Sequence, residues 1–346
     1  MAELMPAAVY VGDGAMTVRG VPVPVAGAGE ALIEISHCGI CGTDLHLVLE
    51  QYARSDSVLG HEWSGTIVAL GSGVEGWDVG ARVVCDTTPG CGECRACRRG
   101  RPAVCLHREE PDWFSYTGAF TRYKKVAAAQ LLPIPDNLST RDAALTEPLA
   151  VTLHTVGLSG VTPEDRVLIT GAGPVGMLTL AVLRAQGVED ITVSEPTPAR
   201  RERALAVGAS VVCTPDELPT APMGNRVEHP YSVIFECSGR ADAAEQAMDQ
   251  LDWAGTFVFV GTGHDMPRVN HNRAIIFEMT IIGAYNYDTG GFAAALDLLA
   301  SGKLPLDLLI EPDDVGLDGV LDAMHQLSAG ELAGKVMVRP TRGGAP

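Results

Sequence analysis

The sequence predicts an α/β protein in which a barrel-like β domain is followed by a doubly wound parallel sheet. Two regions of the 346-residue chain, which differ in composition and in their pattern of apolar residues, support this prediction. From about Pro6 to Gln130 the chain is rich in glycine and proline and contains only short strand-like runs. From Arg166 onward, apolar strand-like runs alternate with helical stretches, which is the pattern of a parallel sheet with crossover helices. The length suggests about two domains.

The first region is predicted to form short strands separated by turn residues, as in a small barrel. A helix is predicted next, over residues 140–157. Ser139 or Thr140 can cap its start, and Gly157 or Gly160 can end it. The clearest strand-like runs are Ala31–Ser36, Gly65–Leu70 and Arg82–Cys85.

The second region is predicted to alternate strands and helices up to about residue 300. The tail from about Lys303 is irregular, and we expect it to return to the first domain. The expected domains are therefore 1–155 and 156–300, with 301–346 rejoining the first. The predicted strands are Arg166–Thr170, Ile191–Ser194, Ser210–Cys213, Tyr231–Glu236, Thr256–Val260 and Thr280–Gly283, and the predicted helices are Pro174–Gln186, Pro198–Val207 and Phe292–Ala300.

Composition excludes several classes of protein. Apolar residues make up 46% and charged residues 20%, a globular balance that excludes a disordered or fibrous chain. The 25 Lys and Arg against 43 Asp and Glu give a formal charge of −18, so we expect no nucleic-acid partner. No apolar stretch reaches the roughly 20 residues of a membrane span, and residues 2–21 lack a signal-peptide pattern. We therefore expect a cytoplasmic protein that does not bind membranes.

Nine cysteines, seven of them between Cys38 and Cys105, indicate metal ligands rather than disulfides in a reducing compartment. The densest group has spacings of three, three and eight residues, which suits tetrahedral zinc in a closed structural site. An iron–sulfur cluster also takes four thiolates, but the long last gap and the missing proline after it oppose that alternative. Unliganded thiols are the other alternative. The predicted structural zinc ligands are Cys91, Cys94, Cys97 and Cys105.

A second, open metal site is predicted upstream of this lobe. Cys41, His61 and a carboxylate, either Glu62 or Glu147, form a mixed set of donors with one position left for water or substrate. One thiolate, one neutral imidazole and one carboxylate cancel the charge of Zn²⁺, which keeps the ion a usable Lewis acid. Cys38 is interpreted as a packed thiol rather than a ligand.

A glycine-rich turn follows the strand at 166–170 and opens a helix. Its glycines permit close approach of backbone N–H groups to a pyrophosphate at a helix N-terminus. Glu195 can accept hydrogen bonds from the adenosine-ribose hydroxyls and repel a 2′-phosphate, which favours NAD over NADP. Arg200 and Arg201 are cofactor candidates that can instead reach such a phosphate, and a turn without nucleotide is the remaining alternative. The turn consists of Gly171, Ala172, Gly173, Pro174, Val175 and Gly176.

In this order, these motifs resemble the zinc-dependent medium-chain alcohol dehydrogenase superfamily, and most of all its sorbitol, threonine and butanediol dehydrogenase branch. The resemblance covers nearly the whole chain. It implies a GroES-like β-barrel catalytic domain plus a Rossmann cofactor domain. The motifs that carry it are Cys38–His46, Gly60–Gly65, the four-cysteine lobe, Thr146–Val151, Gly171–Gly176 and Gly334–Pro340.

The resemblance also implies roles for individual residues. Cys41 and His61 match catalytic zinc ligands, and Glu62 matches an acid that binds zinc in some states and withdraws in others. Glu147 stands where liver-type members carry a cysteine and the polyol branch carries an acid, so it either binds zinc or holds the zinc-bound water. Thr43 matches the hydroxyl that bonds the substrate alcohol, and His46 matches the far end of a proton relay.

The implied activity is hydride transfer between a secondary alcohol or polyol, or the matching ketone, and a nicotinamide cofactor, preferably NAD, with two zinc ions per chain. The alternatives are an NADP-dependent ketone reductase of a biosynthetic pathway, a non-catalytic zinc-binding member, and a zinc-free quinone or enoyl reductase. The branch is often tetrameric, so a homo-oligomer, tetramer or dimer, is expected. Candidate pocket walls are Trp113, Phe114, Tyr116, Phe120 and Tyr285.

Overall fold

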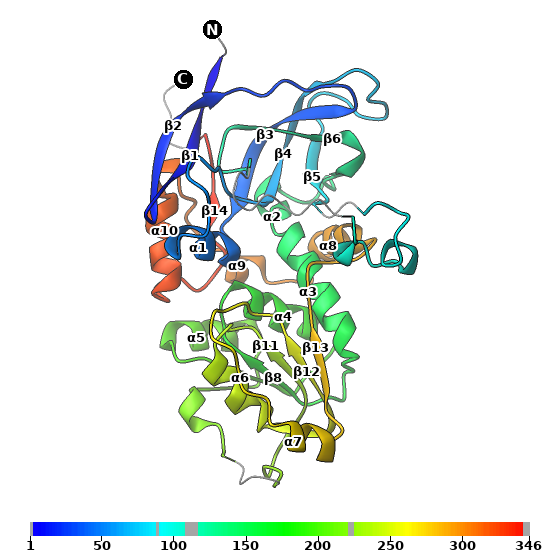
Figure 1. The fold of residues 1–346 in the computed structure, drawn as a ribbon, viewed down its shortest axis with the longest axis vertical. Coiled ribbons are helices and arrows are strands. Elements are labelled where there is room, and N and C mark those ends of the chain that lie inside the picture. Colours follow the sequence, from blue (N-terminus) through cyan, green and yellow to red (C-terminus); the bar gives the residue numbers. More distant parts are fainter. Residues whose placement is uncertain (1–2, 88–89, 108–116, 221–224, 342–346) are drawn as a thin grey trace. The chain divides into compact units, whose positions relative to one another are not determined.

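The computed structural model describes residues 3–87, 90–107, 117–220 and 225–341. Contacts divide the chain into two compact units. Unit 1 comprises Met1–Ala150, Asp288–Gly302 and Ile310–Pro346, and unit 2 comprises Val151–Tyr287 and Lys303–Leu309. The predicted class is confirmed, with a β-rich unit and a parallel-sheet unit (Figure 1). Domain boundaries after residues 155 and 300 stay a prediction, although the contacts assign residues 288–302 to unit 1.

Unit 1 is organised around an antiparallel sheet with the strand order β14-β3-β4-β5-β7, in which β6 also pairs with β3. Strand β3 alternates buried and half-buried positions, so its isoleucines Ile33 and Ile35 reach the core, where Ile67 of β4 is also buried. A separate hairpin is formed by β1 and β2. The strands are β1 (Leu4–Gly12), β2 (Ala15–Pro22), β3 (Glu30–Gly39), β4 (Glu62–Leu70), β5 (Arg82–Cys85), β6 (Tyr123–Ala127), β7 (Leu131–Pro133) and β14 (Met337–Val338).

The C-terminal segment adds ordered structure to unit 1. Met337 and Val338 of β14 pair with Gly39 and Cys38 at the end of β3. The expected irregular tail also contains a helix, α10, which buries Val320, Ala323, Met324 and Leu327 at helical spacing. The longer helices of unit 1 outside the α2–α3 region are α1 (Gly42–Leu49), α8 (Gly291–Ala300) and α10 (Val320–Ser328).

The single helix predicted over residues 140–157 is wrong in one respect, because the structure has two helices, α2 (Thr140–Ala143) and α3 (Thr146–Ser159). Pro148 has no N–H group to donate to the carbonyl of Ala144, so a continuous helix would lose a hydrogen bond there. Ser139 caps α2 as expected, since its Oγ accepts the N–H of Asp142 at 3.0 Å. Gly160 follows α3 with a φ of +68°, a conformation that favours glycine.

Unit 2 contains a six-stranded parallel sheet with the order β10-β9-β8-β11-β12-β13. Its predicted strands are present, and β12 begins earlier than expected, at Leu251. The elements are β8 (Val167–Thr170), α4 (Pro174–Ala185), β9 (Ile191–Ser194), α5 (Pro198–Val207), β10 (Val211–Cys213), β11 (Tyr231–Glu236), α6 (Ala241–Met248), β12 (Leu251–Phe259), α7 (His271–Ile276), β13 (Thr280–Gly283) and α9 (Leu306–Leu309).

The direction of strand addition in unit 2 reverses beside β8. From β8 the chain proceeds to β9 and β10 on one side, and then crosses to β11, β12 and β13 on the other. In open parallel sheets, ligands bind at the carboxyl ends of the strands at such a reversal. The loops after β8 and β11 therefore border the expected binding crevice. In the described part of the chain, no helix combines the length and apolar character needed to cross a bilayer.

Candidate active site

Three potential metal ligands of unit 1 come together where β3 and β4 meet. Cys41 precedes α1, just after β3, and His61 immediately precedes β4, whose first residue is Glu62. Gly39 of β3 pairs with Glu62 of β4. Cys41 and His61, which are 20 positions apart in the sequence, therefore lie at the same end of the sheet. The ligand atoms of Cys41, His61 and Glu62 all lie within 4.8 Å of one another.

The carboxylate of Asp44 holds the two loops of this cluster together. Asp44 is 1% exposed, and its two oxygens accept the N–H of Cys41 at 3.0 Å and the N–H of Gly60 at 3.2 Å. One oxygen also lies 3.7 Å from Nδ1 of His61. Gly60 has a φ of +93°, and a Cβ there would lie 2.8 Å from the Phe120 ring. The loop before His61 therefore needs both glycine and the Asp44 carboxylate.

The surroundings of the Glu62 carboxylate test whether a cation fits the site formed by Cys41, His61 and Glu62. Its side chain is 1% exposed, and Oε1 accepts a hydrogen bond from Nζ of Lys335 at 2.7 Å. Oε2 is buried and has no hydrogen-bond partner among the described residues. A buried carboxylate oxygen without a partner costs free energy. Since this carboxylate also lies beside a thiol and an imidazole, the donor set fits Zn²⁺.

Sequence reasoning missed Lys335, which matters because it is a fully buried lysine. It is 1% exposed and also donates to the carbonyl of Ile40 at 3.0 Å. Burial by itself would lower the pKa of Lys335, but the charges of Glu62 and Cys41 raise it, so the ammonium group stays protonated. The available signal was a single lysine directly before the apolar run Val336–Val338.

The other predicted residues of this site lie around the cluster. Glu147 is 8% exposed, and burial raises its pKa to about 7, but its carboxylate is not part of the three-residue group. The hydroxyl of Thr43 lies 3.7 Å from Sγ of Cys41. His46 lies one turn later on α1, where its Nδ1 is 2.9 Å from Oε1 of Glu50.

The four cysteines of the lobe also converge. The Sγ atoms of Cys91, Cys94, Cys97 and Cys105 lie within 4.8 Å of one another, and all are free thiols. Backbone N–H groups point at the sulfurs, as in the 3.4 Å contact from Cys97 N to Cys94 Sγ. These N–H donors lower the pKa of Cys94 to about 6 and also lower that of Cys105, whereas burial raises the pKa of Cys97. Without a cation, four adjacent thiols cannot all ionise.

In unit 2 the glycine-rich turn has the geometry expected at a helix start. Gly171 has a φ of +86°, and Pro174 and Val175 open helix α4 after Gly173. A Cβ on Gly176 would lie 1.9 Å from the Gly171 carbonyl oxygen, so only glycine permits this turn. The first N–H groups of α4 lack partners within the helix, which makes this end suitable for an anion.

Glu195 follows β9 and is 3% exposed. Its Oε2 accepts the N–H of Ala172 at 2.8 Å, and its Oε1 accepts the N–H of Thr197 at 2.9 Å. The carboxylate therefore lies against the glycine-rich turn, and its contact with a ribose stays a prediction. Arg201 donates to the carbonyls of Glu195 and Pro196, both at 2.7 Å, and Arg200 precedes it on α5.

The candidate pocket aromatics are only partly covered by the structure. Trp113, Phe114 and Tyr116 lie outside the described residues. Phe120 is fully buried in the core of unit 1, whereas Tyr285 of unit 2 is 48% exposed.

Comparisons with known proteins agree with this geometry. Residues 27–136 match the alcohol dehydrogenase GroES-like domain, and residues 174–301 match the zinc-binding dehydrogenase domain. The chain is 36% identical to an L-threonine 3-dehydrogenase of Pyrococcus horikoshii, over 94% of this chain and 95% of that one. The chain belongs to the zinc-dependent medium-chain dehydrogenase family.

Two further dehydrogenases are similar over nearly the whole chain. A sorbitol dehydrogenase of Halalkalibacterium halodurans is 32% identical, over 95% of this chain and 97% of that one. A putative zinc-binding dehydrogenase of Sinorhizobium meliloti, solved bound to NADP, is 30% identical with a TM-score of 0.85. That comparison covers 98% of this chain and all of the solved one.

Proposed function

We propose that this medium-chain dehydrogenase is a zinc-dependent oxidoreductase that transfers a hydride between a secondary alcohol or polyol, or the matching ketone, and NAD. The observation that carries the proposal is the convergence of Cys41, His61 and Glu62, with a buried Glu62 oxygen that no described group satisfies. The geometry of the glycine-rich turn in unit 2 is the observation that supports a dinucleotide cofactor. The threonine and sorbitol dehydrogenase relatives support the substrate class.

In this proposal Cys41, His61 and Glu62 hold the catalytic zinc, and the buried Glu147 is the alternative third carboxylate. Bound zinc would polarise the alcohol oxygen, and bound nicotinamide would accept the hydride. Thr43, at the edge of the cluster, would accept a hydrogen bond from the alcohol hydroxyl, and His46 would be the far end of the relay that releases the proton to solvent. Cys91, Cys94, Cys97 and Cys105 would hold a second, structural zinc.

The proposed preference for NAD rests on Glu195. A buried carboxylate beside the glycine-rich turn repels the 2′-phosphate of NADP, and Arg201 is already engaged with two backbone carbonyls. The NADP-bound relative supports the second candidate, an NADP-dependent ketone reductase, in which Arg200 would bind the phosphate.

The first experiment measures zinc per chain on protein purified without added metal, together with NADH and NADPH binding by fluorescence. We expect about two zinc ions per chain and NADH binding at least about tenfold tighter than NADPH binding. A screen of secondary alcohols and polyols then identifies the substrate. Tighter NADPH binding would favour the ketone reductase. Zinc in the lobe alone, with no cofactor bound, would favour a non-catalytic member of the family.

We also propose a cytoplasmic homo-oligomer, dimer or tetramer, formed through the β13 edge of the sheet in unit 2. This edge has exposed apolar side chains nearby, including Trp253 at 62% and Ile275 at 71%, and Ile281 of β13 itself is 40% exposed. Edge strands readily pair with another chain, and a lysine on the edge opposes such pairing.

Ile281→Lys should therefore reduce the oligomer mass measured by light scattering. Val211→Lys on the opposite edge strand, β10, is the matched control and should leave it unchanged. A monomeric wild type would contradict the proposal.

A further inference from the structure

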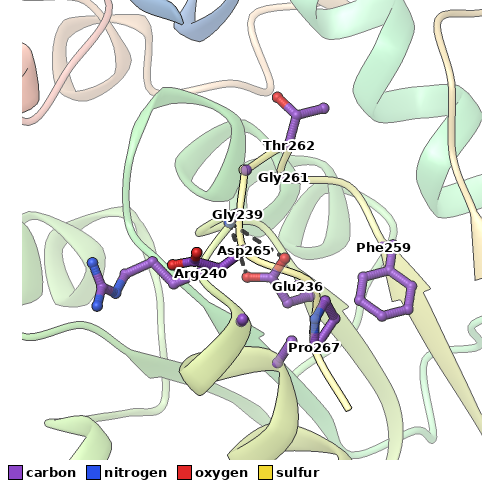
Figure 2. A pocket seen from close by; sticks show the side chains of 11 residues that line it. Glu236, Gly239, Arg240, Phe259, Gly261, Thr262, Asp265 and Pro267 are labelled. Carbon is purple, nitrogen blue, oxygen red and sulfur yellow. Dashed lines mark hydrogen bonds between the residues drawn. The ribbon is translucent and has the colours of Figure 1, made fainter. Parts of the chain in front are cut away.

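A second buried carboxylate lies at the carboxyl edge of the parallel sheet, and nothing in the proposed chemistry uses it. Glu236 is the last residue of β11 and is 1% exposed. Its Oε1 accepts the N–H of Ser238 at 2.8 Å, the N–H of Gly239 at 3.1 Å and the hydroxyl of Thr170 at 3.3 Å. Figure 2 shows the carboxylate turned toward Gly239. Each of these partners is a neutral donor, so the charge is stabilised by the turn after β11 and by β8.

This turn, residues 237–240, borders the crevice at the strand reversal between β8 and β11. It touches the glycine-rich turn directly, because a Cβ on Gly171 would lie 2.9 Å from Cα of Ser238. The two turns that border the expected dinucleotide crevice are therefore in contact with each other, and the position of one turn constrains the position of the other.

The same turn also touches the loop after β12. Gly239 has a φ of +70°, and a Cβ there would lie 2.2 Å from the carbonyl oxygen of Thr262. A Cβ on Gly263 would lie 1.8 Å from the carbonyl oxygen of Gly239. A cleft of about 230 Å³ opens beside this contact and is lined by Glu236, Phe259 and Thr262, among others (Figure 2). Backbone packing this close tolerates little displacement of the turn.

We propose that Glu236 is a positioning residue for the cofactor: its buried carboxylate fixes the turn at residues 237–240 as the wall of the dinucleotide crevice that faces the glycine-rich turn. This inference rests on the proposed nicotinamide-dependent function. The Glu236 carboxylate and the turn depend on each other. The turn supplies the N–H groups that compensate the buried charge, and a displacement of the turn would leave the Thr170 hydroxyl of β8 as the remaining donor named here. Burial raises the pKa of Glu236, and the N–H donors of the turn oppose that rise.

The test compares three variants for NADH affinity, zinc content and thermal melting. Glu236→Ala removes the acceptor and should weaken NADH binding by at least about tenfold, while zinc per chain stays unchanged. Glu236→Gln keeps an acceptor oxygen and should remain within about threefold of wild type. Glu245→Ala is the matched control, because it removes a carboxylate of α6 that pairs with Arg268 away from the turn.

Two results would overturn the inference: NADH binding by Glu236→Ala within threefold of wild type, or Glu236→Gln as weak as Glu236→Ala. If wild type itself bound neither NADH nor NADPH, the proposed function would fail and this inference with it. Should Glu236→Ala not fold, hydrogen exchange in cofactor-free wild type decides. The amides of Ser238 and Gly239 donate to a buried carboxylate and should exchange slowly, and fast exchange would exclude the proposed role.

Discussion

We expect Cys41→Ser to lower turnover by more than about a hundredfold and to reduce the zinc content from about two ions per chain to about one. The reason is the composition of the cluster. Serine supplies a neutral hydroxyl where a thiolate would balance the metal charge, and only His61 and Glu62 then remain as close ligands. The measurement is metal analysis on purified protein, together with steady-state oxidation of the best secondary alcohol from the screen.

Cys38→Ser is the matched control for that variant. Cys38 lies three residues earlier, is fully buried, and has its Sγ 3.6 Å from the carbonyl of Gly39. It is absent from the group of close ligands, so this variant should keep both zinc ions and most of the activity. Full turnover by Cys41→Ser, or equal loss of zinc in both variants, would refute the assignment of the catalytic site.

We expect Lys335→Ala to destabilise the metal-free protein by about 3–5 kcal/mol, because it leaves the buried Glu62 carboxylate without its cation. The side chains of this pair are 2% and 1% exposed, so water cannot replace the lost partner. Bound zinc should reduce the loss, since the metal supplies the missing positive charge. Urea unfolding of the chelated and the zinc-loaded protein measures both effects.

Lys125→Ala is the control for the lysine experiment. Lys125 pairs with both oxygens of Glu30 at 3.1 Å, but its side chain is 48% exposed, and surface pairs contribute little. This variant should unfold at nearly the same urea concentration as wild type. An equally small change for Lys335→Ala would mean that the buried pair contributes nothing measurable to stability.

Some features of the site were predictable because they are local in the sequence. The glycine-rich turn needs a strand, three glycines and a helix start within about a dozen residues. The four-cysteine lobe closes within 15 residues, so its spacing alone indicates a metal centre. The alternation of strands and helices after Arg166 likewise predicted the parallel sheet.

The choice between Glu62 and Glu147 was left open by the sequence. Both glutamates follow plausible motifs, and spacing along the chain cannot rank them. The structure places Glu62 within the group of close ligands and Glu147 outside it. Lys335, 273 residues away in the sequence, helps to hold Glu62 in place, because its Nζ binds Oε1 and leaves Oε2 without a hydrogen-bond partner among the described residues.

The fold class and the local motifs could be predicted from the sequence, because each depends on residues that are near neighbours along the chain, and the order of those motifs carried the family resemblance. Which charges share a buried site depends on how distant segments of the chain pack together. The β3–β4 register brings His61 to Cys41, and β14 places the C-terminal segment with Lys335 beside them. The contact of the Glu236 turn with Gly171 likewise requires two separate strands to lie side by side. Such pairings depend on packing between distant segments, for which no local spacing in the sequence supplies a signal.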